Sequence, residues 1–145
     1  MFLIPIAVQR DDNGTLLITS PILPEVTTFA DTEREIRERA TDAVEEAIAA
    51  RVAAWEDTKV KFKENRSTRY VRLPMLSGLK FALFLLCKKE GVSRADLMRK
   101  LKTHRNQVDR LFDLNHASKL DQIEEAMAAL GKEVEVEVRN QRAYA

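Results

Sequence analysis

Pro74 divides the 145-residue sequence into two parts in which the apolar residues follow different periods. Before Pro74, short runs of β-branched and other apolar residues alternate with turn-forming residues, which is typical of an antiparallel sheet. After it, apolar residues recur at helical spacing as far as Gly131. We therefore predict an α+β chain: residues 1–73 form a domain with a small antiparallel sheet and one covering helix, and residues 74–145 form an all-α domain that ends in a short strand.

Four short strands are predicted in the first domain, at residues 2–9, 15–19, 26–29 and 70–74. The segment Asp11–Gly14 joins the first two in a hairpin, because Asn and Gly adopt positive φ at little cost. Pro21 and Pro24 interrupt the pairing, since proline has no N–H to donate. A helix then starts near Thr32, which has capping-box spacing with Glu35. Its apolar stripe is expected to lie on the sheet.

The charged residues are distributed unevenly along the chain. Residues 1–58 contain 5 basic and 12 acidic side chains, a net charge of −7, whereas residues 59–145 contain 19 basic and 11 acidic ones, a net charge of +8. Around the change of sign, residues 56–69 form a polar, basic stretch without helical period, which we interpret as a connector. An acidic and a basic half suit two different partners, and chance segregation of solvated charge is the alternative.

Cysteine usage and hydropathy indicate the compartment. The single cysteine, Cys87, lies in an apolar run, where we expect a buried thiol rather than a disulfide or a metal ligand. The apolar start of the chain lacks the basic residues and the cleavage pattern of a signal peptide, and no apolar run is long enough to cross a bilayer. We therefore expect a soluble cytoplasmic protein that binds no cofactor, no metal ion and no membrane.

The stretch after the first buried helix of the second domain has the pattern of a helix-turn-helix. Ser93 and Asp96 have capping-box spacing at the start of a short helix that ends near Leu101. After a three-residue turn, a second short helix is predicted at residues 105–113. Its buried side is expected to hold Val108, Leu111 and Phe112. In a helix-turn-helix the second helix lies in the DNA major groove, with its first turn against the base edges.

The outward side chains of this second helix suit base recognition. Arginine makes paired hydrogen bonds to guanine, and asparagine or glutamine makes them to adenine. The turn residues, and a lysine at the start of the next helix, are expected near phosphate groups. The predicted DNA-binding residues are Lys102, Thr103, His104, Arg105, Asn106, Gln107, Asp109, Arg110 and Lys119. An ordinary helical hairpin with a solvated basic face is the alternative.

A strictly alternating segment, Glu133–Arg139 (EVEVEVR), follows a last predicted helix that Ser118 or Asp121 caps. The alternation predicts a strand with one apolar face. Because a lone strand leaves its edge unpaired, we expect it to pair with a second copy of the chain or with the N-terminal sheet. A two-fold dimer of this kind would present paired recognition helices to a palindromic operator, and a frayed tail is the alternative. The predicted dimerisation residues are Val134, Val136 and Val138.

With these features the chain resembles the HicB antitoxins of bacterial HicAB toxin–antitoxin systems over nearly its whole length. Residues 15–47 (TLLITSPILPEVTTFADTEREIRERATDAVEEA) are similar to the family's strand, proline-flanked segment, acidic-threonine motif and helix. Residues 92–136 resemble the helix-turn-helix version of the family. The most specific parts of this second match are RLFDLNHASKLD, at residues 110–121, and ALGKE, at residues 129–133.

The resemblance implies a fold and a function for each domain. The first domain would be a partly degenerate RNase H-like domain without nuclease activity. It would bind and neutralise HicA, a small basic mRNA-cleaving toxin with a double-stranded-RNA-binding-like fold. The second domain would dimerise, bind operator DNA and repress its own operon. The expected toxin-binding residues, from the proline-flanked segment and the acidic face of the first helix, are Pro21, Leu23, Pro24, Glu25, Glu38, Asp42, Glu45 and Glu46.

Three residues depart from the pattern of the family and of its helix-turn-helix. Ala30 stands where glycine is frequent, and His104 stands where a serine cap is common. Lys102 stands where the turn usually has a glycine in the left-handed conformation, which costs a lysine about 1 kcal/mol. These departures bear on the geometry of the turn and on which DNA bases the second helix recognises.

Two other functions fit parts of the sequence. A stand-alone transcriptional regulator with a ligand-sensing N-terminal domain would bind DNA without a toxin gene beside its own. An active RNase H-like nuclease would need several carboxylates that converge on two metal ions. The carboxylates of the first domain's strand region stand in turns or at the ends of elements instead. They are Asp11, Asp12, Glu25 and Asp31, and we therefore expect no enzymatic activity.

Overall fold

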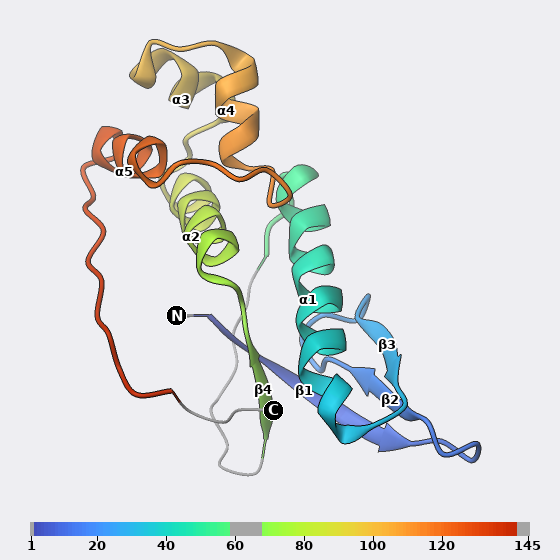
Figure 1. Ribbon diagram of the computed structural model, residues 1–145. Helices are drawn as coiled ribbons and strands as arrows, with labels where there is room; N and C mark the ends of the chain where they lie inside the picture. The colour runs from blue at the N-terminus through green and yellow to red at the C-terminus, as the bar shows by residue number, and fades with distance from the viewer. Residues whose placement is uncertain (1, 59–67, 142–145) are drawn as a thin grey trace. The chain divides into compact units, whose positions relative to one another are not determined.

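The computed structural model describes residues 2–58 and 68–141, which have an α+β fold (Figure 1). These residues divide into two compact units. The described part of the first unit comprises residues 2–50 and 68–74, and the second unit comprises residues 51–58 and 75–141. Most of the predicted basic connector at 56–69 lies outside the described residues.

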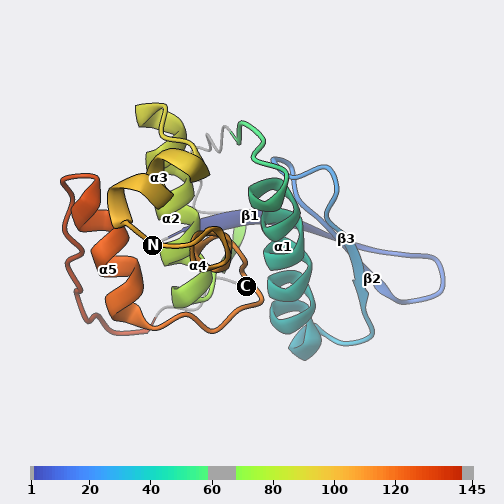
Figure 2. The same cartoon turned by 90° about the horizontal axis from the view of Figure 1, so that it is seen from above.

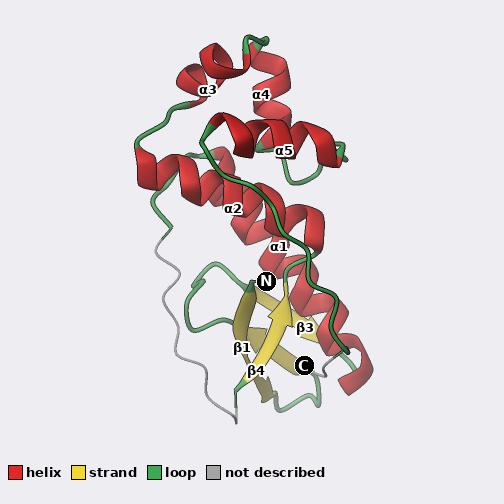
Figure 3. Ribbon diagram, turned by 90° about the vertical axis from the view of Figure 1, so that its left-hand side faces the viewer, coloured by secondary structure: helices red, strands yellow, loops and turns green. Residues whose placement is uncertain are grey.

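The first unit contains a four-stranded antiparallel sheet. Its strands are β1 (Leu3–Arg10), β2 (Leu16–Thr19), β3 (Thr27–Ala30) and β4 (Arg69–Arg72). They lie in the order β3-β2-β1-β4, and Figure 3 draws the strands in yellow. Ile4 is opposite Val71 across one pair of strands, and Leu17 is opposite Phe29 across another. The four predicted strands are therefore confirmed, with their ends shifted by a residue or two.

The hairpin between β1 and β2 forms as the sequence predicts. Asp11 donates its N–H to Thr15 O at 2.8 Å, and Gly14 donates to Asp11 O at 2.9 Å. Gly14 has a φ of +85°, a conformation that glycine adopts without strain. The side-chain oxygen of Asn13 accepts the Thr15 N–H at 3.1 Å, which closes the turn.

Helix α1 (Ile36–Ala53) packs its apolar side into the core of the first unit, where Ile36, Ala40, Val44 and Ile48 are buried. The predicted capping box at its start is wrong. The chain enters α1 through a 3-10 turn, Glu33–Glu35, and Thr32 makes no side-chain capping hydrogen bond. Glu35 reaches back instead to the N–H of Asp31, at 3.1 Å, because the tighter turn changes which donor it meets.

The second unit is helical (Figure 2). Its helices are α2 (Met75–Glu90), α3 (Arg94–Leu101), α4 (Arg105–Leu111) and α5 (Leu120–Ala129). Helix α3 contacts α4 and α5, and α5 also contacts α2. The core includes Phe81, Phe84 and Cys87 from α2, all fully buried, so the prediction of a buried thiol is confirmed. Burial raises the pKa of Cys87 to about 11, which keeps the thiol protonated.

The strand predicted at Glu133–Arg139 does not form in the single chain, and its pairing with a second copy stays a prediction. Within residues 2–58 and 68–141, this segment forms no strand. Val136 is 68% exposed and Val138 is 92% exposed. A strand requires a neighbouring backbone to pair with, and no part of the described chain provides one here.

Within the described residues, no helix is both long and apolar enough to span a membrane. No group of three or more His, Cys, Asp or Glu side chains in residues 2–58 and 68–141 is arranged to hold a metal ion.

Candidate nucleic-acid interface

Helices α3 and α4 are joined by the three residues Lys102, Thr103 and His104. Lys102 has φ +50° and ψ +47°, the left-handed conformation expected for this position. The Lys102 N–H donates a hydrogen bond to Arg99 O at 3.3 Å, and the Thr103 N–H donates one to Met98 O at 3.2 Å. These two bonds form a Schellman motif, which ends α3 and usually has glycine where Lys102 stands.

The predicted capping box at the start of α3 is confirmed. Asp96 donates its N–H to Ser93 Oγ at 3.1 Å, and Ser93 donates its own N–H to Asp96 Oδ2 at 3.0 Å. Arg99 also pairs with the Asp96 carboxylate. The hydrogen bonds from Ser93 and the nearby Arg99 lower the pKa of Asp96 below its usual value. The first helix of the pair is therefore fixed at both ends by its own local sequence.

The predicted second helix is confirmed as α4, although it ends at Leu111 rather than Asp113. Val108, Leu111 and the following Phe112 are buried. His104 is the N-cap residue, and its side chain makes no capping hydrogen bond. The backbone oxygen of His104 accepts the N–H of Gln107 at 3.1 Å.

Most of the predicted DNA-binding side chains are exposed. The exposed members are Lys102, His104, Arg105, Asn106, Gln107, Arg110 and Lys119, whereas Thr103 and Asp109 are half-buried. The geometry thus separates a buried apolar side of α4 from an outer side with guanidinium and amide groups. Such a surface can offer paired donors and acceptors to a base edge.

Lys119 is the N-cap residue of α5. The predicted caps of that helix are wrong. Ser118 Oγ donates to Arg110 O at 3.3 Å and lies 3.1 Å from His116 Nδ1, so it serves the preceding loop. Asp121 accepts a 2.9 Å hydrogen bond from the next N–H, that of Gln122.

Lys80, which the sequence patterns missed, supports the end of α4 from inside. This side chain on α2 is fully buried. Its ammonium group donates to three backbone oxygens: Arg110 O at 2.9 Å, Asp113 O at 2.7 Å and His116 O at 2.6 Å. Desolvation lowers the pKa of Lys80, and the charge of Asp113 opposes that shift.

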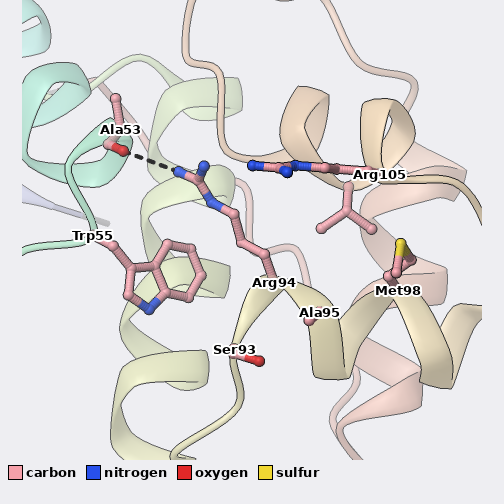
Figure 4. A pocket seen from close by; sticks show the side chains of 8 residues that line it. Ala53, Trp55, Ser93, Arg94, Ala95, Met98 and Arg105 are labelled. Carbon is pink, nitrogen blue, oxygen red and sulfur yellow. Dashed lines mark hydrogen bonds between the residues drawn. The ribbon is translucent and has the colours of Figure 1, made fainter.

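Arg94, at the start of α3, is a second residue that sequence reasoning missed. Its guanidinium group lies 5.0 Å from the ring centre of Trp55 and 5.8 Å from that of Phe112. It donates hydrogen bonds to Val52 O at 3.3 Å and Ala53 O at 3.2 Å, and Figure 4 shows the bond to Ala53. The residue lines a pocket together with Trp55 and Arg105. An arginine in a capping sequence gives no sign that it will pack on distant aromatic rings.

The expected toxin-binding residues lie in the first unit, and one of them is corrected by the structure. Leu23 is fully buried, because it fills the core beside the sheet, so it is not part of the surface. The others are exposed or half-buried: Pro21, Pro24, Glu25, Glu38, Asp42, Glu45 and Glu46. The four acidic residues of α1 are spaced so that they lie along one side of the helix.

No known family model matches the sequence. The chain is 33% identical over 129 residues to a protein of Pseudomonas fluorescens (strain Pf0-1) named Antitoxin HicB, and the match covers 86% of each chain. It is 29% identical over 133 residues to Antitoxin HicB 2 of Photorhabdus laumondii, covering 91% of this chain and 93% of the relative. It is 25% identical over 130 residues to Antitoxin HicB of Escherichia coli (strain K12), covering 90% of this chain and 94% of the relative.

Proposed function

Because this chain belongs to the HicB antitoxin family, we propose that it neutralises a HicA-type mRNA-cleaving toxin by direct binding and represses its own operon through its helix-turn-helix. The names of its relatives support the antitoxin role. The two activities use different units of the chain and act in the cytoplasm. Neither activity requires catalysis by this protein.

One observation carries the DNA-binding half of the proposal. Helix α4 hides Val108 and Leu111 while the side chains of Arg105, Asn106 and Gln107 remain exposed. Three consecutive polar side chains in a first helical turn, held on a buried support, are the arrangement that a recognition helix needs. Lys102 and Lys119 flank this turn in sequence and are exposed, as suits contacts with phosphate.

The toxin-binding half is supported by charge. Residues 1–58 have a net charge of −7, which is complementary to a basic toxin. The exposed acidic residues of α1 and the prolines beside Glu25 supply candidate contacts. In this mechanism the first unit covers the toxin's catalytic surface or RNA path. The meander β1–β3 followed by a helix and β4 also supports the finer inference of a reduced RNase H-like fold.

The operator-binding species is proposed to be a homodimer, or a higher even oligomer. Val136 and Val138 are exposed and Val134 is half-buried, and all three alternate with glutamates. A second copy of the same segment would give this segment an antiparallel partner. Two recognition helices related by two-fold symmetry would then match the two halves of a palindromic site.

Co-expression with the product of the adjacent reading frame tests the proposal. We expect a basic protein of small size to co-purify with this chain, and the complex to bind the duplex upstream of the gene pair. Growth arrest by the adjacent protein alone, relieved by this chain, would show neutralisation. Absence of any co-purifying protein, together with retained DNA binding, would favour a stand-alone regulator instead.

A further inference from the structure

Asp109, on the inner edge of α4, lies between two arginines. Its Oδ1 is 3.6 Å from Arg94 Nη1, and its Oδ2 is 3.6 Å from Arg105 Nε. The Arg105 side chain is 82% exposed, whereas those of Asp109 and Arg94 are 37% and 31% exposed. The Asp109 carboxylate therefore lies between a partly buried arginine, Arg94, and a largely exposed one, Arg105.

Among Arg94, Asp109 and Arg105, Arg94 is the residue whose position is fixed by further contacts. Its two hydrogen bonds to the last carbonyls of α1 and its position over Trp55 and Phe112 leave it few alternative conformations. The Trp55 ring is itself held edge-on against Phe84 and Phe112, with ring centres 5.3 Å and 4.9 Å apart. Figure 4 shows the guanidinium groups of Arg94 and Arg105 turned toward one another. Two cations in this arrangement need the charge of Asp109 to offset their repulsion.

The buried half of the carboxylate argues against Asp109 as a direct contact to a base. Its Oδ1 atom is buried and, within the described residues, has no hydrogen-bond partner. Only Oδ2 faces outward, and that atom is the one beside Arg105. A contact through Nε leaves both terminal nitrogens of Arg105 available, and these two donors match the O6 and N7 acceptors of guanine.

We propose that Asp109, anchored by Arg94, is a positioning residue that aims Arg105 and so sets a guanine preference of the recognition helix. The inference rests on the proposed DNA-binding function. The ion pairs at 3.6 Å are longer than hydrogen bonds, so Arg105 is directed but not immobilised before DNA arrives. The free-energy cost of ordering this long side chain on binding is therefore reduced.

A double-mutant cycle on base preference tests this role. Duplexes with randomised sequence are selected with the full-length protein, and the base preference at each position is measured for wild type, Asp109→Asn, Arg105→Ala and the double variant. We expect Arg105→Ala to remove a guanine preference of about fivefold or more. Asp109→Asn should weaken the same preference by roughly two- to fivefold. The double variant should behave as Arg105→Ala alone does.

Glu124→Gln, at an exposed position of α5, is the charge-matched control. Both Asp109→Asn and Glu124→Gln remove one negative charge, so both should raise affinity for all sequences to a similar degree. Only Asp109→Asn should change the base preference. If Asp109→Asn alters the preference equally with and without Arg105, the carboxylate reads a base itself and the inference is overturned.

The remaining outcomes separate this inference from the function on which it rests. A guanine preference that depends on Arg105 but is unchanged by Asp109→Asn would overturn the positioning role and leave DNA binding intact. A wild-type protein that selects no sequence from the library would contradict the proposed function itself. The Arg94→Lys variant, which keeps the charge but loses the planar fork, should shift the preference in the same direction as Asp109→Asn.

Discussion

The ammonium group of Lys80 donates a 2.9 Å hydrogen bond to the backbone oxygen of Arg110, in the last turn of α4. The two residues are 30 positions apart in the sequence. A buried cation at the C-terminal end of a helix is favoured by the helix dipole. Helix α4, which we propose contacts DNA, is therefore stabilised at its C-terminal end by the buried ammonium group of Lys80.

Replacing Lys80 with Met keeps the length of the side chain and removes its three hydrogen bonds. Hydrogen bonds from charged donors contribute about 1.5–3 kcal/mol each, so we expect the free energy of unfolding of the second unit to fall by about 3 kcal/mol or more. Urea denaturation followed by the fluorescence of Trp55, the single tryptophan, measures this loss. The exposed Lys89→Met variant on the same helix should change stability by less than about 0.5 kcal/mol. Equal effects of the two substitutions would contradict the role of Lys80.

The lowered pKa of Asp96 predicts a dependence of stability on pH. The folded-state pKa lies below the unfolded value of 3.8, so the charged carboxylate stabilises the fold above that value. This contribution is lost as the pH falls through the lower, folded-state pKa. Asp96→Asn should therefore be less stable than wild type at pH 7, and the difference should shrink as the pH falls below about 4. Denaturant midpoints at several pH values would show it, and a difference independent of pH would count against the account.

The local geometry of the helix pair could be predicted because it depends on neighbouring residues. Ser93 and Asp96 form their capping box with each other, and Val108 and Leu111 follow the helical period. The same local logic failed at Thr32, where a 3-10 turn replaced the expected first helical turn. Capping spacing alone does not determine which kind of turn begins a helix.

The supporting contacts could not be predicted, because their partners are far away in the sequence. Lys80 interrupts an apolar helix and looks like a solvated residue, yet its acceptors lie 30 to 36 residues later. Arg94 reaches carbonyls 41 and 42 residues earlier. The final valine segment is a different case, since its predicted strand forms only when a partner backbone is present, and the single chain does not test that pairing.

Lys102 has a left-handed backbone conformation, so two substitutions at this residue can separate the effect of backbone strain from that of side-chain charge. Lys102→Gly and Lys102→Ala both remove one cation near the proposed phosphate path, so they should weaken DNA binding equally and lower the salt slope by about 1. Only the glycine relieves the strain, so Lys102→Gly should be more stable than Lys102→Ala by about 1 kcal/mol. Thermal unfolding and salt titrations of DNA binding measure the two effects. Equal stability of the two variants would show that the turn is not strained in solution.

The alternating valines after Gly131 are the basis for predicting that the protein forms a dimer. Val136→Glu and Val138→Glu place charges on the apolar side of the alternating segment, so we expect both variants to lose the dimer at micromolar concentration. Glu135→Gln, on the opposite side, should leave it unchanged. Sedimentation velocity of the full-length variants makes the comparison. A dimer that survives both valine substitutions would place the contact between copies elsewhere.

The outer side of α4 is the surface on which the proposed DNA recognition depends most, and one measurement tests it directly. Affinities for the duplex upstream of the gene, and for a scrambled duplex of equal length, are measured for wild type, Arg105→Ala and Lys119→Ala over a range of salt concentrations. We predict that Arg105→Ala abolishes the preference for the upstream duplex, whereas Lys119→Ala weakens binding to both duplexes alike and reduces the salt slope by about 1. An Arg105→Ala protein that still prefers the upstream duplex as strongly as wild type would contradict the assignment of α4 as the recognition helix.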